Sequence, residues 1–198
     1  MGLLDFFKRR KPEAAARQEP VDPLLSQIAA AYPKGPVRRG SFKGVPRFHD
    51  LTGKAPVIDE VMVFDAEDHW FFLFLGCRPL GLPFELSFRT TKAGSEPPPD
   101  WCVEPVTRVA NMIGDGAECA PGVTWVIGSP IGDASSAFVG FMALPDMQFG
   151  DVEPARLLQL VPVTRAELDM HGPDHVQLCR SLESDHQRMM GVPGSHGS

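Results

Sequence analysis

Three side chains near the C-terminal end have the types and the spacing that could hold a metal ion. His171, His175 and Cys179 lie four residues apart, a spacing that places side chains on one face of a helix. Imidazole and thiolate groups are zinc ligands. With His186 as a further candidate, the set suggests a metal-dependent hydrolase. Pro173 argues against it, because a proline begins a helix more readily than it continues one and would separate His171 from the others.

Other sequence features that could carry catalysis or bind a cofactor are weak. Asp65, Glu67, Asp68 and His69 fall within one predicted hairpin turn, and charges in such a turn are usually solvated. The sequence contains no G-x-S-x-G nucleophile motif, no P-loop and no dinucleotide fingerprint. We therefore expect no catalytic residue, no metal and no cofactor, so that the hydrolase remains an alternative interpretation.

Three residues in the middle of the chain are candidates for binding a partner. Glu85 and Arg89 lie four residues apart in a predicted strand, so their side chains share one face of the sheet. We expect that face to be the polar one, where the two residues form either an exposed ion pair or a polar anchor for a partner. Trp101 follows a proline-rich loop and begins a predicted helix, where it either fills the core or contacts a ligand.

The elements that position these residues are predicted from hydrophobic periodicity and capping residues. Asp22 and Pro23 are suited to the N-cap and first position of a helix that Pro33 and Gly35 end. Residues 34–56 are expected to be irregular. Strands are predicted at 57–64, 69–75, 84–90, 123–127, 138–144 and 157–163, and further helices at 101–113, 165–168 and 173–186. This order favours an α+β fold with a mixed, mostly antiparallel sheet covered by helices.

Several of these elements carry specific expectations. The strands 57–64 and 69–75 should form a hairpin, and the second is apolar enough to be covered on both faces. Strand 84–90 alternates, which predicts one buried and one exposed face. The helix 101–113 should bury Val106, Val109, Ala110 and Ile113. Thr164 and Glu167 have the spacing of a capping box.

Composition and charge limit the class of protein. The 198 residues carry a net charge of −6, which divides into +6 up to Lys54 and −12 from Ala55 onward. An acidic body argues against nucleic acid as the ligand. The four cysteines form no paired motif and indicate reduced thiols in the cytoplasm. We expect one domain at 21–187 between a flexible tail at 1–20 and a disordered tail at 188–198.

The first eleven residues leave a third interpretation open. Residues 1–11 combine Leu3, Leu4, Phe6 and Phe7 with a run of four basic side chains. Such a segment could attach a scaffold protein to a membrane surface, or it could be a frayed end of the chain. It is too short to insert stably across a membrane.

Four blocks of the sequence, taken in order, resemble the suppressor of fused (SUFU-like) family. They are His69-Trp70, FELSFR at 84–89, PPPDW at 97–101 and LQLVPVTRAEL at 158–168. The resemblance extends over about residues 22–185. It implies an α/β sandwich that has no catalytic machinery and binds other proteins.

The resemblance also directs the functional expectation. Eukaryotic relatives bind a transcription-factor peptide through an acidic residue that corresponds to a position near Val123, so this contact is not matched here. Stand-alone bacterial relatives are thought to include immunity proteins that neutralise toxins. The leading hypothesis is therefore a bacterial, cytoplasmic, non-enzymatic binding domain, with neutralisation of a toxin domain as its specific form.

Overall fold

The computed structural model describes residues 22–42, 54–92, 97–128, 130–131, 136–150, 156–171 and 175–189. Its strands are β1 (Arg38–Ser41), β2 (Glu60–Asp65), β3 (His69–Leu75), β4 (Phe84–Thr91), β5 (Thr124–Val126), β6 (Phe138–Pro145) and β7 (Arg156–Thr164). Its helices are α1 (Pro23–Ala31), the 3-10 helix η1 (Arg78–Leu80), α2 (Val103–Gly114), α3 (Arg165–His171), α4 (His175–Ser184) and α5 (His186–Met189). Every predicted strand is present, with ends that shift by a few residues at most.

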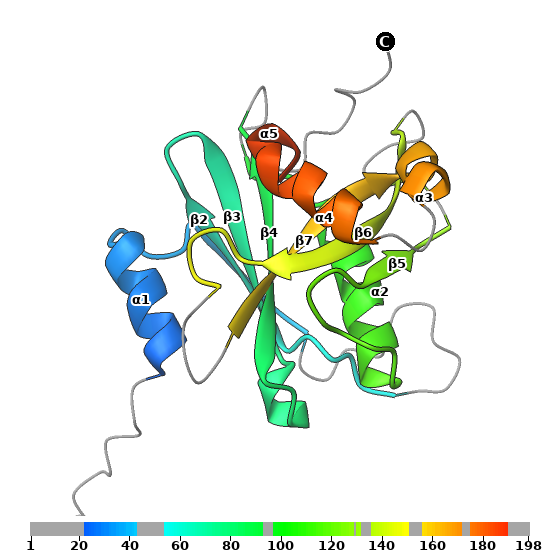
Figure 1. Ribbon diagram of the computed structural model, residues 1–198. Helices are drawn as coiled ribbons and strands as arrows, with labels where there is room; N and C mark the ends of the chain where they lie inside the picture. Colours follow the sequence, from blue (N-terminus) through cyan, green and yellow to red (C-terminus); the bar gives the residue numbers. More distant parts are fainter. Residues whose placement is uncertain are drawn as a thin grey trace, which may run out of the picture.

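The strands form one seven-stranded sheet in the order β1-β2-β3-β4-β7-β6-β5. All neighbouring strands are antiparallel except β4 and β7, which run parallel. Helices lie on both faces of this sheet (Figure 1). The predicted α+β fold with a mixed, mostly antiparallel sheet is confirmed.

Helix α2 covers one face of the sheet. Its predicted inner residues, Val106, Val109, Ala110 and Ile113, are all buried. They join a cluster that includes the side chains of β2, β3, β4, β6 and β7 that point to this face. Strand β3 is buried on both of its faces, as its continuous apolar sequence predicted.

The opposite face carries two separate apolar clusters. Helix α1 packs Leu24 and Ile28 over side chains of β2 and β3. Helices α4 and α5 pack Leu178, Leu182 and Met189 over β6 and β7. Figure 1 shows α1 apart from the group α3–α5, with β4 passing between them. The side chains of β4 on this face are therefore positioned between two apolar clusters.

Two sequence signals for helix starts are confirmed. The carboxylate of Asp22 accepts hydrogen bonds from the backbone N–H groups of Leu24 and Leu25, which are two of the donors that the first helical turn leaves unsatisfied. At α3, Glu167 accepts from the backbone N–H of Thr164 at 2.9 Å and donates its own N–H to the Thr164 hydroxyl at 3.2 Å. This is the predicted capping box.

One sequence prediction about an element is wrong, and one short helix was not foreseen. Residues 38–41 lie in the segment predicted to be irregular, yet they form β1 and pair with β2. The helix predicted at 173–186 is present as α4, and a further short helix, α5, follows it, with Asp185 accepting the backbone N–H of Arg188. Residues 1–21 and 190–198, which include most of the predicted tails, lie outside the described residues.

Candidate functional site

Strand β4 differs from its prediction at the two charged residues proposed to bind a partner. Glu85 is 3% exposed and Arg89 is fully buried, whereas the alternating sequence predicted an exposed polar face. The reason is that helices on both sides of β4 enclose this face. The side chains of Glu85 and Arg89 instead find polar partners inside the protein.

Four buried polar residues, here called the polar seam, lie between the two apolar clusters: Ser87, Arg89, Asp146 and Gln159. The Arg89 guanidinium donates to both carboxylate oxygens of Asp146, at 2.5 and 2.9 Å. It also donates to the side-chain oxygen of Gln159 at 2.7 Å. Ser87 donates its hydroxyl to Asp146 at 2.5 Å. Such a bidentate, fully hydrogen-bonded pair is the form in which buried charges are tolerated.

Asp146 also organises the turn that follows β6. It accepts the backbone N–H groups of Gln148 and Phe149, each at 2.9 Å. Burial alone would raise the pKa of Asp146, but the Arg89 charge and these donors hold the pKa below its ordinary value. Asp146 is thus a structural anion.

The polar seam connects the sheet to both apolar clusters. The Arg89 guanidinium lies over the ring of Phe71, 4.6 Å from its centroid, which links it to the cluster under α1. Gln159 donates to the backbone oxygen of Met189 at the end of α5. Arg89 is thus buried, and these contacts join the two apolar clusters within the protein.

Glu85 occupies a nest of backbone donors at the end of the sheet. Its carboxylate accepts the N–H groups of Gly76, Cys77 and Arg78 at 3.0, 2.9 and 3.3 Å. Gly76 has φ +146°, and a Cβ there would lie 2.0 Å from the Val57 carbonyl oxygen, so only glycine fits. Burial raises the pKa of Glu85 despite these three hydrogen bonds.

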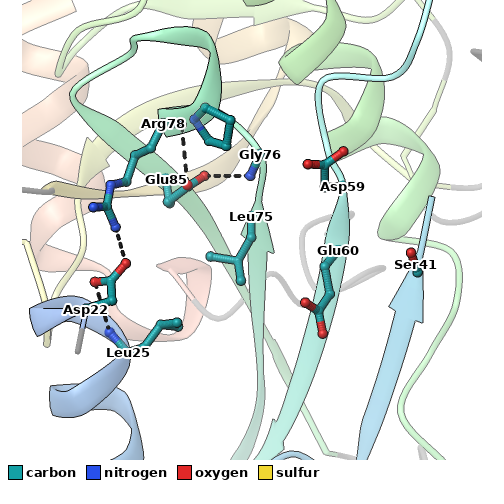
Figure 2. A pocket seen from close by; sticks show the side chains of 10 residues that line it. Asp22, Leu25, Ser41, Asp59, Glu60, Leu75, Gly76, Arg78 and Glu85 are labelled. Carbon is teal, nitrogen blue, oxygen red and sulfur yellow. Dashed lines mark hydrogen bonds and ion pairs between the residues drawn. The ribbon is translucent and has the colours of Figure 1, made fainter. Parts of the chain in front are cut away.

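A pocket of about 680 Å³, here called the acidic pocket, opens beside Glu85. It is lined by Asp22, Leu25, Ser41, Asp59, Glu60, Leu75, Gly76, Arg78, Pro79 and Glu85. Figure 2 shows Asp22, Arg78 and Glu85 on one side of it and Glu60 and Ser41, at the ends of β2 and β1, on the other. These residues come from α1, four strands, η1 and the segments that join them, so only the folded sheet brings them together.

The charges that line the acidic pocket are mostly negative. Four carboxylates, those of Asp22, Asp59, Glu60 and Glu85, face a single cation, Arg78. Arg78 already forms an ion pair with Asp22. When all four acids are ionised, the lining therefore has a net charge of −3. Such a pocket attracts a cationic group.

Trp101 lies on the other face of the sheet from Glu85. It packs edge-on against Phe88, with ring centroids 5.7 Å apart, and it is partly exposed at a small pocket beside α2. The three predicted partner-binding residues therefore do not form one surface. Of these, only Glu85 lines the acidic pocket. Asp59 and Glu60 were not predicted, because their contribution depends on the ends of β1 and β2 meeting η1.

The metal site considered as an alternative at His171, His175 and Cys179 is not supported by the geometry of the described residues. The described residues contain no group of three or more His, Cys, Asp or Glu side chains that could hold a metal ion. His171 ends α3 while His175 begins α4, so the predicted trio is divided between two helices. The side chain of His175 lies outside the described part.

The thiols and the charged hairpin turn also have structural explanations. Burial raises the pKa of the Cys77 and Cys102 thiols and raises that of Cys119 to about 12, which suppresses the reactive thiolate. In the hairpin turn, Asp65 pairs with Lys92, whose ammonium group lies 4.7 Å from the centroid of the Trp70 ring. Among the described residues, no helix is long and apolar enough to cross a membrane.

Comparison with known proteins identifies the fold. No protein-family model and no curated protein sequence matches the chain. The structure is similar to that of the Sufu–Fu complex (TM-score 0.62, 16% identity, 88% of each chain covered). It is also similar to Drosophila Suppressor of Fused (TM-score 0.65, 16% identity), covering 88% of this chain and 49% of that one. A SUFU homolog from Neisseria gonorrhoeae gives a TM-score of 0.59 at 14% identity, with 83% and 90% covered. The chain therefore has a SUFU-like fold.

Proposed function

We propose that this chain is a non-enzymatic domain that binds another protein, with the acidic pocket as a principal contact. The SUFU-like fold supports the first part, since a solved structure with this fold is that of a Sufu–Fu complex. The observation that carries the second part is the charge of the pocket. Its four carboxylates are accompanied by one lining cation, Arg78, which pairs with Asp22, and Glu60 lies 3.8 Å from the guanidinium of Arg39.

The chemistry of the pocket indicates what the partner presents. A lysine or arginine side chain could enter an open pocket at the end of the sheet and pair with Asp59 and Glu60. The wider charge distribution acts in the same direction, because the chain from Ala55 onward has a net charge of −12. Such a field accelerates association with a basic protein.

A basic toxin, such as a nuclease, is the class of partner that we favour. Nucleases bind phosphates and therefore present basic surfaces. An acidic protein that covers such a surface would block the substrate site and so act as an immunity protein. We propose that this binding takes place in the cytoplasm of the producing cell.

The function can be tested by capturing the partner in the source organism. The full chain, crosslinked in cells and purified, should carry one basic protein in a fixed molar ratio. Expression of that protein alone should arrest growth, and co-expression of this chain should restore it. Recovery of chaperones alone would contradict the binding function. A captured partner that is harmless on expression would contradict the immunity role and leave the binding function standing.

A further inference from the structure

The sequence contains a run of basic residues that the proposed function does not use. Lys8, Arg9, Arg10 and Lys11 are consecutive and are here called the basic run. Ten residues, 12–21, join this run to Asp22. Asp22 is both the N-cap of α1 and part of the lining of the acidic pocket. The basic run is therefore tethered to the rim of that pocket.

The tether is long enough for the basic run to reach every part of the acidic pocket. An extended chain spans at most about 3.5 Å per residue, so ten residues cover up to roughly 35 Å. The tether begins at Asp22, on one side of a cavity of about 680 Å³. Glu60 and Ser41 form the other side (Figure 2). The run has to cross only the width of this cavity.

The basic run and the acidic pocket are complementary in charge. The lining has a net charge of −3 when its four acids are ionised, and its cation, Arg78, pairs with Asp22. Asp59 and Glu60 lie across the pocket from that ion pair (Figure 2). Glu60 is 3.8 Å from the guanidinium of Arg39, whose side chain is 60% exposed, and a surface pair of this kind contributes little. A basic side chain that enters the pocket can therefore pair with Asp59 and Glu60.

We propose that the basic run folds back into the acidic pocket of its own chain and competes there with the partner. A tethered group acts at an effective concentration on the order of 1 mM, so even a weak contact fills the pocket in a large share of the molecules. The partner then binds only the remaining share, which lowers its apparent affinity. This inference rests on the proposed function and adds the regulation of the same site.

A second copy of the chain and a membrane surface are the other possible binding sites for the basic run. A second copy offers the same pocket, but it would have to be present at about the effective concentration of the tether to compete with it. Anionic lipids could attract the run together with the apolar residues that precede it. The pocket needs no further component, because its carboxylates belong to the same molecule.

Zero-length crosslinking of the full chain tests the contact. A carbodiimide condenses a lysine amine with a carboxylate that touches it and takes up the water that is released. We expect mass spectrometry to find a lysine of the basic run joined to Asp59 or Glu60. The ion pair of Lys54 with Asp115, whose charged atoms lie 2.9 Å apart, is the internal positive control. Coupling of the control pair without any product between the run and the pocket would overturn the proposal.

Two further measurements separate the own pocket from the other binding sites. In a mixture of unlabelled and ¹⁵N-labelled chains, the crosslink should join residues of the same label, whereas mostly mixed products would assign the run to a second copy and overturn the proposal. Vesicles of phosphatidylcholine and phosphatidylserine test the membrane. If wild type floats with them as strongly as a chain with Asp59→Asn and Glu60→Gln, the run belongs to the membrane and the proposal fails. Weaker flotation of wild type, or none of either chain, supports the pocket.

Neutralising the basic run tests the regulation with the captured basic partner. The run variant carries Arg9→Gln, Arg10→Gln and Lys11→Gln. The control variant loses the same charge at exposed positions elsewhere and carries Lys34→Gln, Arg165→Gln and Arg180→Gln. The run variant should bind the partner about threefold or more tightly than the control, because its pocket is no longer occupied. Equal affinities would overturn the competition.

The crosslink and the partner assay distinguish this inference from the proposed function. A crosslink between the basic run and the pocket in a chain that captures no partner would leave the contact standing and contradict the proposed function. A partner that binds through the pocket of a chain in which this crosslink does not form would leave the proposed function standing and contradict the inference.

Discussion

Arg89 and Asp146 place opposite charges where the two apolar clusters of one sheet face meet. The four-residue spacing of Glu85 and Arg89 on β4 suggested a surface anchor, but both side chains are buried and hydrogen-bonded. The partners of Arg89 lie 57 and 70 residues away in the sequence. A short sequence pattern carries no information about partners that are so far away in the chain. The sequence could therefore predict that Arg89 and Glu85 share a face of the sheet, but not that this face is buried.

Removing Arg89 should be strongly destabilising. Arg89→Met leaves Asp146 as an unpaired buried charge, which typically costs about 3–5 kcal/mol. The free energy of unfolding, measured with urea by circular dichroism, should fall by that amount. Arg108→Met is the matched control, since Arg108 pairs with Glu104 at the surface and should change stability by about 0.5 kcal/mol or less. A similar, small effect of both substitutions would contradict a structural role for the polar seam.

Asp146 should also make stability depend on pH in the acid range. Its folded pKa lies below the ordinary value of 3.8, so the unfolded chain binds a proton more readily than the folded chain. The stability contributed by Asp146 is therefore present above pH 3.8 and lost as pH falls through the folded pKa. Urea unfolding between about pH 5 and pH 2 should show a steeper loss for wild type than for Asp146→Asn. Parallel curves would show that Asp146 is not held as an anion.

At the scale of elements, the sequence predicted those parts whose signals lie close together in the chain. It did not predict the parts that depend on contacts between distant residues. Helix α1 and the capping box at Thr164 were predicted because their signals lie within four residues of one another. Strand β1 was missed because four residues, RRGS, contain no apolar alternation. Strand β1 forms because its backbone can pair with the edge of β2. The acidic pocket was missed for a related reason: its lining meets only where strand ends and η1 converge.

The link between β3 and η1 allows a direct test of the nest around Glu85. Gly76→Ala should cost about 3 kcal/mol or more, because a Cβ would collide with the Val57 carbonyl and the donors of Glu85 would move. Gly81→Ala is the control, with φ +83° and no atom within 4 Å of the added Cβ, and should cost about 1–2 kcal/mol. Thermal unfolding distinguishes the two. Equal melting temperatures would mean that the nest tolerates movement.

At the scale of the whole molecule, charge and fold lead to one functional account. A SUFU-like sheet is covered by helices on both faces (Figure 1), and the acidic pocket opens at one end of it. The acidic sequence from Ala55 onward extends the field beyond the pocket and should speed encounter with a basic partner. Raising the salt concentration should therefore slow association more than it changes dissociation, which stopped-flow mixing with the captured partner would measure.

The affinity of the captured partner for two variants of equal net charge is the most direct test of the acidic pocket. One variant combines Asp59→Asn with Glu60→Gln in the pocket, and the other combines Glu118→Gln with Asp169→Asn at exposed positions outside it. By calorimetry, the pocket variant should bind about tenfold or more weakly than wild type, and the control should bind within about twofold of it. Equal affinities of the two variants would contradict the account, since only the overall charge, and not the pocket, would then matter.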